Sequence, residues 1–352
     1  MLNLDDLGWD AAFADAFAPH LAAGLVAGRV AIEDKHAYRV VTTAGELAAK
    51  VTGRLLHHTR THTALPKVGD WVALAPEAGT ERATIHRVLP RRTAITRQAA
   101  GTARSEQVLA ANVDTAFLVQ ALDISFNLRR LERFLVMVRE GGVQPVVVLN
   151  KADLCEAVAR REAEARALAG PAPVVVTSAQ SRRGVSPLKE FLHPARTVVF
   201  IGASGVGKSS LINQLYGEEI QATIEVREHD AKGRHTTAWR ELIMLPGGAL
   251  VIDTPGMREF HMWLAGEGLE EAFPEITELA AGCHFRDCTH ASEKGCAVLA
   301  AVAAGQLGRD RHASFQKLRL ELDYLAEERL RHTYLTRKRN AAARRNARHL
   351  AG

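Results

Sequence analysis

The sequence predicts a multidomain α/β protein made of a small β-barrel, an α/β domain and a mostly helical C-terminal region. Two observations predict this class. Short β-rich runs broken by turn residues occupy residues 24–100, and from about residue 108 apolar runs alternate with helical segments. A chain of 352 residues has room for two or three such cores. The expected parts are an N-terminal helical extension (1–23), a barrel (24–104), an α/β domain (105–265) and a helical domain with a basic tail (266–352).

The N-terminal part combines one helix with a run of short strands. Trp9, Phe13 and Phe17 are spaced by four residues, so we expect residues 1–22 to form a helix with one aromatic face. Strands this short and regular are typical of a small barrel such as an OB-fold. The predicted barrel strands are 28–32, 37–42, 68–74 and 84–89.

The net charge of +5 conceals two strongly basic stretches. Residues 50–104 and 331–352 each carry +7, which leaves −9 for the rest of the chain. This distribution suggests a polyanionic partner held at two places, although on charge alone a solvated tail and a solvated sheet face explain it better. The basic residues expected on one barrel face are Arg54, Arg60, Arg82, Arg87, Arg91, Arg92 and Arg97, with His57, His58 and His62 nearby.

The predicted α/β domain alternates buried strands with helices. Asn127 is expected to cap one helix, residues 156–169 form a second, and a third begins at Lys208. This alternation predicts a doubly wound sheet. The strand candidates are 116–120, 146–149, 174–177, 198–201, 242–245 and 249–252. Near the C-terminus the apolar helix face consists of Phe315, Leu318, Leu322 and Leu325.

A phosphate-binding loop follows the strand predicted to end at Ile201. The segment beginning at Gly202 fits G-x-x-x-x-G-K-[ST] and lies between a strand and a helix, as this motif requires. Its backbone N–H groups surround phosphate oxygens, Lys208 reaches the β- and γ-phosphates, and Ser209 ligates Mg²⁺. The motif does not separate ATP from GTP. The predicted binding residues are Gly202, Ala203, Ser204, Gly205, Val206, Gly207, Lys208, Ser209 and Ser210.

Two further loops indicate which base is bound. The segment Asn150, Lys151, Ala152, Asp153 follows the strand 146–149. An Asp carboxylate there can accept hydrogen bonds from guanine N1–H and from the exocyclic amine, whereas adenine offers no matching pair of donors. Asn150 can bond the purine edge, and the Lys151 stem can cover the ring. After the next strand, Ser178 and Ala179 supply a backbone N–H that could meet guanine O6.

The remaining nucleotide motifs concern Mg²⁺ and hydrolysis. Asp253 ends a predicted strand, where a carboxylate can hold Mg²⁺, and the N–H of Gly256 can contact the γ-phosphate. The polar segment 233–237 is suited to a switch loop in which Thr236 or Thr237 completes the Mg²⁺ shell; the sequence does not choose between them. The base-reading motifs precede the phosphate loop, so the domain is expected to be a circularly permuted GTPase.

Three of the four cysteines lie within fourteen residues. With one histidine they form Cys283-x₄-Cys288-x-His290-x₅-Cys296, the donor set of a closed tetrahedral zinc site. Such a site leaves no position for water, so we expect one structural Zn²⁺. The alternative is a set of buried core cysteines, which the polar, loop-like segment disfavours.

The sequence predicts a soluble, cytoplasmic protein. The N-terminal residues carry acid and lead into no apolar segment, so no signal peptide is expected. No apolar run approaches the roughly 18 residues that a membrane span needs, so no membrane partner is expected either.

Taken together, these motifs resemble the RsgA family, also called YjeQ, of small ribosomal subunit biogenesis GTPases. The resemblance also covers residues 65–72, 110–114 and 126–130, and it extends to Cys296. It implies an N-terminal OB-fold β-barrel that binds RNA, a circularly permuted P-loop GTPase domain and a C-terminal α-helical zinc-binding domain. Such a protein binds the small (30S) subunit and its 16S rRNA, assists late maturation, hydrolyses GTP to GDP when stimulated by the subunit, and then dissociates. We expect a monomer.

The resemblance leaves the hydrolytic residue open. Lys208, Asp253 and Gly256 are expected at the reacting phosphate, but Met257 stands where many GTPases have a glutamine that orients water. A thioether cannot orient a water molecule. His235, in the switch segment, is our candidate for that role; its alternative is a solvent-exposed loop histidine.

Two other functions compete with this prediction. One is a zinc-stabilised RNA-binding assembly chaperone that uses GTP only as a structural or switch ligand. Lys208, Ser209 and Asp253 together argue against it because they form a complete catalytic set. The other is a P-loop kinase, which leaves the guanine-reading loops unexplained.

Overall fold

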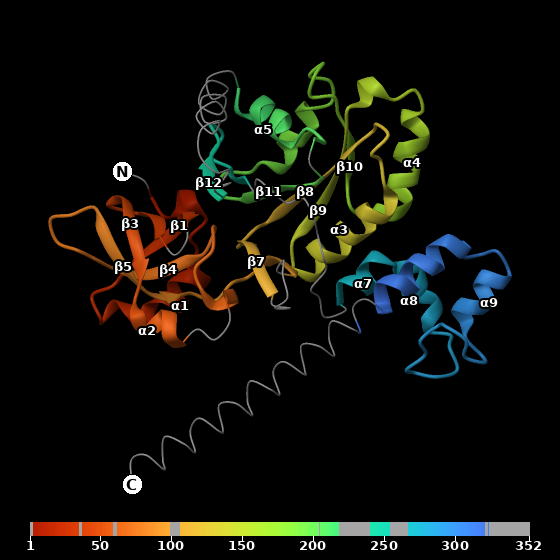
Figure 1. The fold of residues 1–352 in the computed structure, drawn as a ribbon, viewed down its shortest axis with the longest axis horizontal. Coiled ribbons are helices and arrows are strands. Elements are labelled where there is room, and N and C mark those ends of the chain that lie inside the picture. The colour runs from red at the N-terminus through yellow and green to blue at the C-terminus, as the bar shows by residue number, and fades with distance from the viewer. Residues whose placement is uncertain are drawn as a thin grey trace, which may run out of the picture. The chain divides into compact units, whose positions relative to one another are not determined.

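The computed structural model describes residues 3–34, 37–58, 62–98, 106–203, 205–217, 240–253, 267–320 and 323. The chain divides into two compact units, Met1–His261 and Met262–Gly352. Figure 1 shows the first unit as a group of red and orange barrel strands joined to yellow and green α/β elements. Each unit is described by itself below.

Five strands form a closed barrel in the order β1-β2-β3-β5-β4, and β4 returns to pair with β1. All pairs are antiparallel except β3 with β5. This arrangement confirms the predicted OB-like barrel. Gly28 lies on β1 where a Cβ would come within 2.5 Å of the Val40 side chain, so only glycine fits there. The strands are β1 (Val26–Asp34), β2 (Ala37–Thr42), β3 (Gly45–Val51), β4 (Trp71–Pro76) and β5 (Arg82–Val88).

Two details of the barrel differ from the sequence prediction. The strand predicted at 68–74 begins only at Trp71, because Gly69 has a φ of +91° and Asp70 turns back to accept a hydrogen bond from the Lys67 N–H at 2.7 Å. The strand β3 was not predicted. The barrel is accompanied by η1 (Asp5–Leu7), α1 (Ala11–Leu21), α2 (Gly53–His58) and η2 (His62–Ala64).

The α/β part is built on five parallel strands in the order β10-β9-β8-β11-β13. The doubly wound sheet is therefore confirmed, with one difference: β12 runs antiparallel to β13. The strands are β8 (Thr115–Ala121), β9 (Gln144–Asn150), β10 (Val174–Val176), β11 (Thr197–Ile201), β12 (Arg240–Met244) and β13 (Leu250–Asp253). A hairpin of β6 (Ala94–Gln98) and β7 (Glu106–Ala111), which was not predicted, leads into this sheet.

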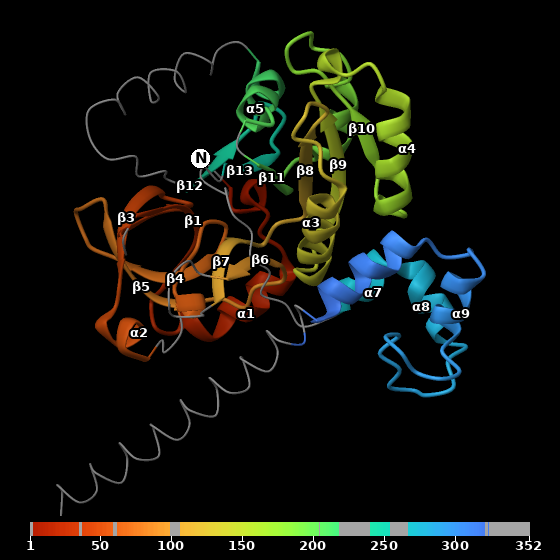
Figure 2. The same cartoon turned by 45° about the vertical axis from the view of Figure 1, so that its right-hand side comes forward.

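Helices cover the sheet where the apolar pattern requires them. The Asn127 side chain accepts the Arg130 N–H at 3.0 Å and so caps α3 (Leu128–Glu140) as predicted. This helix packs on β8 and β9 and against α4 (Val158–Ala169). Leu211 of α5 (Lys208–Tyr216) belongs to the buried cluster that includes Phe117 of β8. Figure 2 shows α4 to the right of β8, β9 and β10 and α5 to their left. Short turns η3 (Ala152–Leu154) and η4 (Ser186–Phe191) complete the unit.

The barrel and the α/β sheet share one continuous hydrogen-bonded ladder. Strand β12 pairs antiparallel with β1, Ile32 opposite Glu241 and Glu33 opposite Arg240. A shift of register in β1 between Val30 and Ile32 separates the part that pairs with β4 from the part that pairs with β12. The result is a single sheet of 11 strands.

A buried arginine connects the same two parts. Arg29 of β1 is 2% exposed, and its guanidinium donates to the carbonyl oxygens of Leu7, Gly69 and Asn112 and to the Thr197 hydroxyl, the last at 2.7 Å. Burial lowers the pKa of Arg29 to about 10. Its acceptors lie on four separate segments, so this side chain holds the barrel against the start of β11.

Arg91 is not part of the predicted basic barrel face. Its guanidinium forms a two-bond ion pair with the fully buried carboxylate of Asp70, with distances of 2.7 Å. It also donates to the carbonyl oxygens of Thr63 and Leu65. A buried carboxylate needs such a partner, so Arg91 neutralises Asp70 inside the barrel and does not lie on its basic face.

The second unit is helical where it is described. It contains α7 (Glu267–Ala272), α8 (Pro274–Ala280), α9 (Ala297–Ala303) and a helical stretch at 309–320. Phe315 and Leu318 are buried, as predicted, and the Phe315 ring contacts Phe273 at 5.4 Å between centroids. Leu322 and Leu325 lie outside the described residues.

None of the helices in the described ranges is long and apolar enough to span a membrane.

Candidate nucleotide-binding site and metal cluster

The predicted nucleotide loops meet at one edge of the sheet. The loop 150–153 follows β9, residues 177–179 follow β10, and the phosphate-binding loop follows β11. These strands are parallel and close together in the order β10-β9-β8-β11, so their carboxyl ends lie on the same side. Ligands of open α/β sheets bind at this edge.

Asn150 ties the three loops together. Its side-chain amide donates to the Val206 carbonyl oxygen at 2.9 Å, and its Oδ1 accepts the Ala179 N–H at 3.0 Å and the Thr177 hydroxyl at 3.1 Å. The residue is 1% exposed. Because these bonds engage both ends of a buried amide, Asn150 fixes the spacing between the base loops and the phosphate loop.

Asp153 lies beside the loop that follows β10. The Ser178 hydroxyl donates to Asp153 Oδ1, and the Ala152 N–H donates to the Thr177 carbonyl oxygen at 3.1 Å. A carboxylate has room for several acceptor contacts, so this bond is compatible with two further donors from a base. The Ala179 N–H is engaged by Asn150, so a guanine O6 at that point has to share or displace this donor.

The phosphate-binding loop has the backbone geometry that its glycines permit. Gly205 and Gly207 have φ values of +77° and +96°. A Cβ on Gly207 would lie 2.2 Å from Asn150 Nδ2, and one on Gly202 would lie 2.4 Å from the Val119 carbonyl oxygen. Helix α5 starts at Lys208, so Ser209 and Ser210 lie in its first turn. These positive φ values and close approaches are why a phosphate-binding loop uses glycine at these positions.

The ammonium of Lys208 lies within its own loop. Its Nζ donates to the carbonyl oxygens of Gly202 at 2.9 Å and Ala203 at 3.0 Å. These contacts keep the positive charge beside the start of the loop that is expected to bind phosphate oxygens.

Several predicted site residues lie outside the described residues. They are Ser204, His235, Thr236, Thr237 and Gly256. Asp253 ends β13, which is parallel to β11, but its side chain is not described.

One charged contact at the same edge was not predicted. The Lys151 ammonium lies 2.9 Å from Asp123 Oδ2, and Asp123 also accepts hydrogen bonds from Ser125. The signal was available in the sequence, since Asp123 follows shortly after the strand predicted at 116–120 and therefore lies at the ligand edge.

The four predicted metal ligands come together in the second unit. The ligand atoms of Cys283, Cys288, His290 and Cys296 all lie within 4.8 Å of one another. Cys283 Sγ is 3.8 Å from Cys296 Sγ and 3.6 Å from His290 Nδ1, and Cys296 Sγ is 3.4 Å from His290 Nδ1. Zn–S and Zn–N bonds of about 2.3 and 2.0 Å at tetrahedral angles place two sulfur atoms about 3.8 Å apart and a sulfur and a nitrogen about 3.5 Å apart. The group could hold a zinc ion.

Neighbouring groups orient these ligands. The carbonyl oxygen of His290 accepts the Gln316 amide at 2.8 Å, and the carbonyl oxygen of Cys288 accepts Arg319 at 3.1 Å. Burial opposes ionisation of Cys283, but backbone N–H groups at the start of α9 outweigh it and lower the pKa of this thiol. Thiolates are the form that binds metal.

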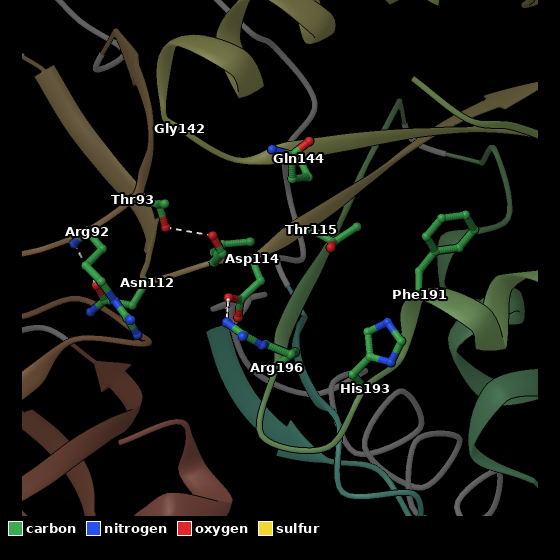
Figure 3. Close-up of a pocket in the computed structure, with 11 residues that line it drawn as sticks. Arg92, Thr93, Asn112, Asp114, Thr115, Gly142, Gln144, Phe191, His193 and Arg196 are labelled. Atoms are coloured by element: carbon green, nitrogen blue, oxygen red, sulfur yellow. Dashed lines mark hydrogen bonds and ion pairs between the residues drawn. The ribbon is translucent and has the colours of Figure 1, made fainter. Parts of the chain in front are cut away.

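A separate cavity lies at the opposite edge of the sheet. Its volume is about 370 Å³, and its lining includes Thr115 and Gln144 at the amino ends of β8 and β9. Figure 3 shows Arg196 beside Asp114 at this cavity, an ion pair of 2.9 Å. The nucleotide loops follow the carboxyl ends of β9, β10 and β11, so the cavity is distinct from the candidate site.

Comparisons with known proteins agree with this geometry. The sequence model of the family described as RsgA GTPase matches residues 88–263. The small ribosomal subunit biogenesis GTPase RsgA of Opitutus terrae is 52% identical over 334 residues, which cover 92% of this chain and 91% of that protein. The protein with the same description from Methanosarcina acetivorans is 41% identical and covers 93% of this chain and 87% of its own.

Two solved structures resemble this fold. The crystal structure of YjeQ from Thermotoga maritima has a TM-score of 0.64 at 27% identity, and it covers 85% of this chain and 98% of that one. The structure of YloQ, described as a circularly permuted GTPase, has a TM-score of 0.59 at 26% identity, with 85% and 95% covered. The loop order of this chain, with the base loops ahead of the phosphate loop, is also that of a circularly permuted GTPase.

Proposed function

The chain belongs to the RsgA family of GTPases, and on this basis we propose that it hydrolyses GTP in association with the small ribosomal subunit and assists the biogenesis of that subunit. The observation that carries the proposal is the Asn150 side chain, which holds two base-reading loops and a phosphate-binding loop together at one edge of the sheet. Joint recognition of guanine and phosphates requires this proximity.

Different residues are proposed to bind the base and the phosphates. Asp153 accepts the N1–H and the exocyclic amine of guanine, Ala179 lies at O6, and the Lys151 stem covers the ring. The loop from Gly202 to Ser210 surrounds the phosphates, and Lys208 exchanges its carbonyl contacts for phosphate oxygens. Backbone donors and a fixed cation stabilise the charge that develops when the γ-phosphate is transferred.

Ser209 and Asp253 would hold the Mg²⁺ that accompanies the phosphates. Ser209 lies in the first turn of α5, the helix that follows β11, and Asp253 ends β13, which is parallel to β11. A hydroxyl and a carboxylate are hard oxygen donors of the kind that Mg²⁺ prefers, so this donor set fits. When bound, the ion neutralises charge on the β- and γ-phosphates. Thr236 or Thr237 is proposed to complete its shell.

The hydrolytic water is proposed to be oriented by His235, with Gly256 at the γ-phosphate. Met257 offers no group that can orient water. Intrinsic turnover is therefore expected to be slow, and the subunit is expected to accelerate it by ordering the site or by supplying the missing group. Replacing His235 with alanine should abolish the acceleration and leave GDP binding intact.

The other parts of the chain are proposed to contact ribosomal RNA and to hold a structural ion. The barrel region (24–104) and the basic tail (331–352) each carry an excess of positive charge, which supports contacts with 16S rRNA phosphates. We propose that a zinc-binding domain (266–352), which would hold the structural ion, follows the GTPase domain (105–265).

We also propose that the protein is a monomer and acts in the cytoplasm, where ribosomal subunits are assembled.

Turnover measurements test the proposed function. Purified protein should hydrolyse GTP slowly alone and many-fold faster with small ribosomal subunits, and the stimulation should fall steeply with salt. Large subunits serve as the control. Equal turnover with small and large subunits would remove the proposal.

Replacing Asp153 with asparagine tests the guanine assignment. An asparagine amide can face the C2 carbonyl of xanthine but repels the guanine amine, so GDP affinity should fall by about 100-fold or more while affinity for xanthosine diphosphate rises. Titration of both nucleotides against each protein measures the change. Unaltered preference for GDP would show that Asp153 does not read the base.

A further inference from the structure

The ammonium of Lys151 is held by the protein itself. Its Nζ lies 2.9 Å from Asp123 Oδ2, and the two side chains are 30% and 23% exposed. The Lys151 backbone has a φ of +61°, a left-handed conformation that fixes the direction in which this side chain leaves the loop. The neighbouring Ala152 and Leu154 N–H groups maintain that turn through bonds of 3.1 and 3.0 Å.

Asp123 is held in place by Ser125, independently of Lys151. Its Oδ1 accepts the Ser125 N–H at 2.8 Å and the Ser125 hydroxyl at 2.5 Å, and Arg130 of α3 donates to the Ser125 carbonyl oxygen. The Ser125 hydroxyl, followed by Lys151, lowers the pKa of Asp123 to about 2. The carboxylate is therefore ionised and held in place throughout the neutral range.

This arrangement matters because a lysine side chain is flexible. Covering a flat ring costs a free lysine much of its rotamer freedom, whereas a side chain already pinned at its ammonium has less freedom left to lose. An exposed ion pair between two mobile side chains contributes little free energy and restrains neither side chain strongly. Here the carboxylate is immobilised by a built loop, so its contact restrains the lysine.

We propose that Asp123 is a positioning residue for the guanine nucleotide, which pins Lys151 so that its stem lies across the purine and slows nucleotide release. This inference rests on the proposed function, since it takes the Lys151 loop as the guanine-reading loop. Asp123 does not itself touch the base. It should therefore alter the rate of release and leave the preference for guanine over xanthine unchanged.

Release of a fluorescent GDP analogue from the full chain, followed by stopped flow, tests the proposal. The variants are Asp123→Asn, Lys151→Met and the double variant; asparagine keeps an acceptor for Ser125, and methionine keeps an apolar stem. We expect each single variant to release GDP about three- to tenfold faster. The double variant should be no faster than Lys151→Met, because Asp123 acts through the lysine.

The chain offers a matched control at the far edge of the sheet. Asp114 pairs with Arg196 at the same distance of 2.9 Å, so Asp114→Asn removes an equivalent ion pair away from the nucleotide loops (Figure 3). It should leave the release rate unchanged. Ser125→Ala loosens Asp123 without removing its charge, so a smaller acceleration is expected, and it decides the question if Asp123→Asn fails to fold.

Two outcomes would overturn the inference. Release from Asp123→Asn at the wild-type rate would show that the pair does not restrain the lysine. If Asp123→Asn accelerated GDP release from the Lys151→Met protein as much as from the wild-type protein, Asp123 would act by supporting its own loop and not through the lysine. Failure of the wild-type protein to bind GDP would instead remove the proposed function, and it is detected before any variant is compared.

Discussion

At the scale of single residues, Gly207 shows how tightly the candidate site is assembled. Its φ of +96° is strained for any residue with a side chain, and a Cβ there would lie 2.2 Å from Asn150 Nδ2. The Asn150 amide is the group that joins the base loops to the phosphate loop. A single methyl group at position 207 therefore disturbs both halves of the site.

We predict that Gly207→Ala weakens GDP binding by more than tenfold and lowers the free energy of unfolding by about 1–3 kcal/mol. The matched control is Gly217→Ala, where φ is +89° but nothing lies within 4 Å of the added Cβ. The control should lose stability through backbone strain and keep its affinity. Urea denaturation and GDP titration measure the two quantities, and equal affinities for both variants would contradict the prediction.

At the scale of elements, the segment 283–296 lacks a regular helix or strand of its own. Most of its order comes from side chains. Glu293 accepts the N–H groups of Thr289, Ala291 and Ser292 at 2.8 to 3.0 Å, and the three thiols and His290 converge at its centre. A segment built in this way depends on whatever holds its thiolates together.

We predict that removal of zinc by a chelator opens this segment to proteolysis between residues 283 and 320. The GDP affinity should remain, because every nucleotide loop lies in the other unit. Metal analysis should find about one zinc per chain, lost in Cys288→Ser and retained in Cys155→Ser, whose cysteine is outside the cluster. Full zinc content in Cys288→Ser would contradict the assignment.

At the scale of the first unit, the barrel and the α/β sheet behave as one body. Strand β12 continues the ladder into β1, and Arg29 crosses from β1 to segments that precede and follow the barrel. Within the described residues, the hydrogen bonds of this guanidinium go to carbonyl and hydroxyl oxygens, and the charges of Asp114 and Asp70 also favour its protonated form. Several buried acceptors depend on it.

We predict that Arg29→Met lowers the free energy of unfolding of the first unit by about 3 kcal/mol, since buried carbonyl oxygens lose their donor. Arg39→Met is the matched control, because Arg39 lies on β2 with an exposed side chain and forms an ion pair of 2.9 Å with the exposed Glu46. No measurable loss is expected there. Urea unfolding followed by tryptophan fluorescence reports on both, and equal midpoints would contradict the prediction.

Much of the first unit was predictable because its strongest signals are local. The apolar runs at 146–149 and 198–201 became β9 and β11, and the Asn127 cap was confirmed. Strand β3 escaped detection because Gly45–Val51 has weak strand propensity and gains its order from pairing with β2 and β5. The contact of Asp123 with Lys151 also joins residues far apart in sequence.

The sequence by itself determined the chemistry that we predict: a phosphate loop at 202–210, a base loop at 150–153 and four candidate metal ligands spaced along one segment. These follow from residue type and local spacing, which a chain carries before it folds. Only the tertiary structure decided which charges act together. Arg91 turns inward to Asp70, Lys151 is held by Asp123, and β12 adds the α/β sheet to the barrel. Such pairings depend on long-range packing, which brings distant residues within hydrogen-bonding distance.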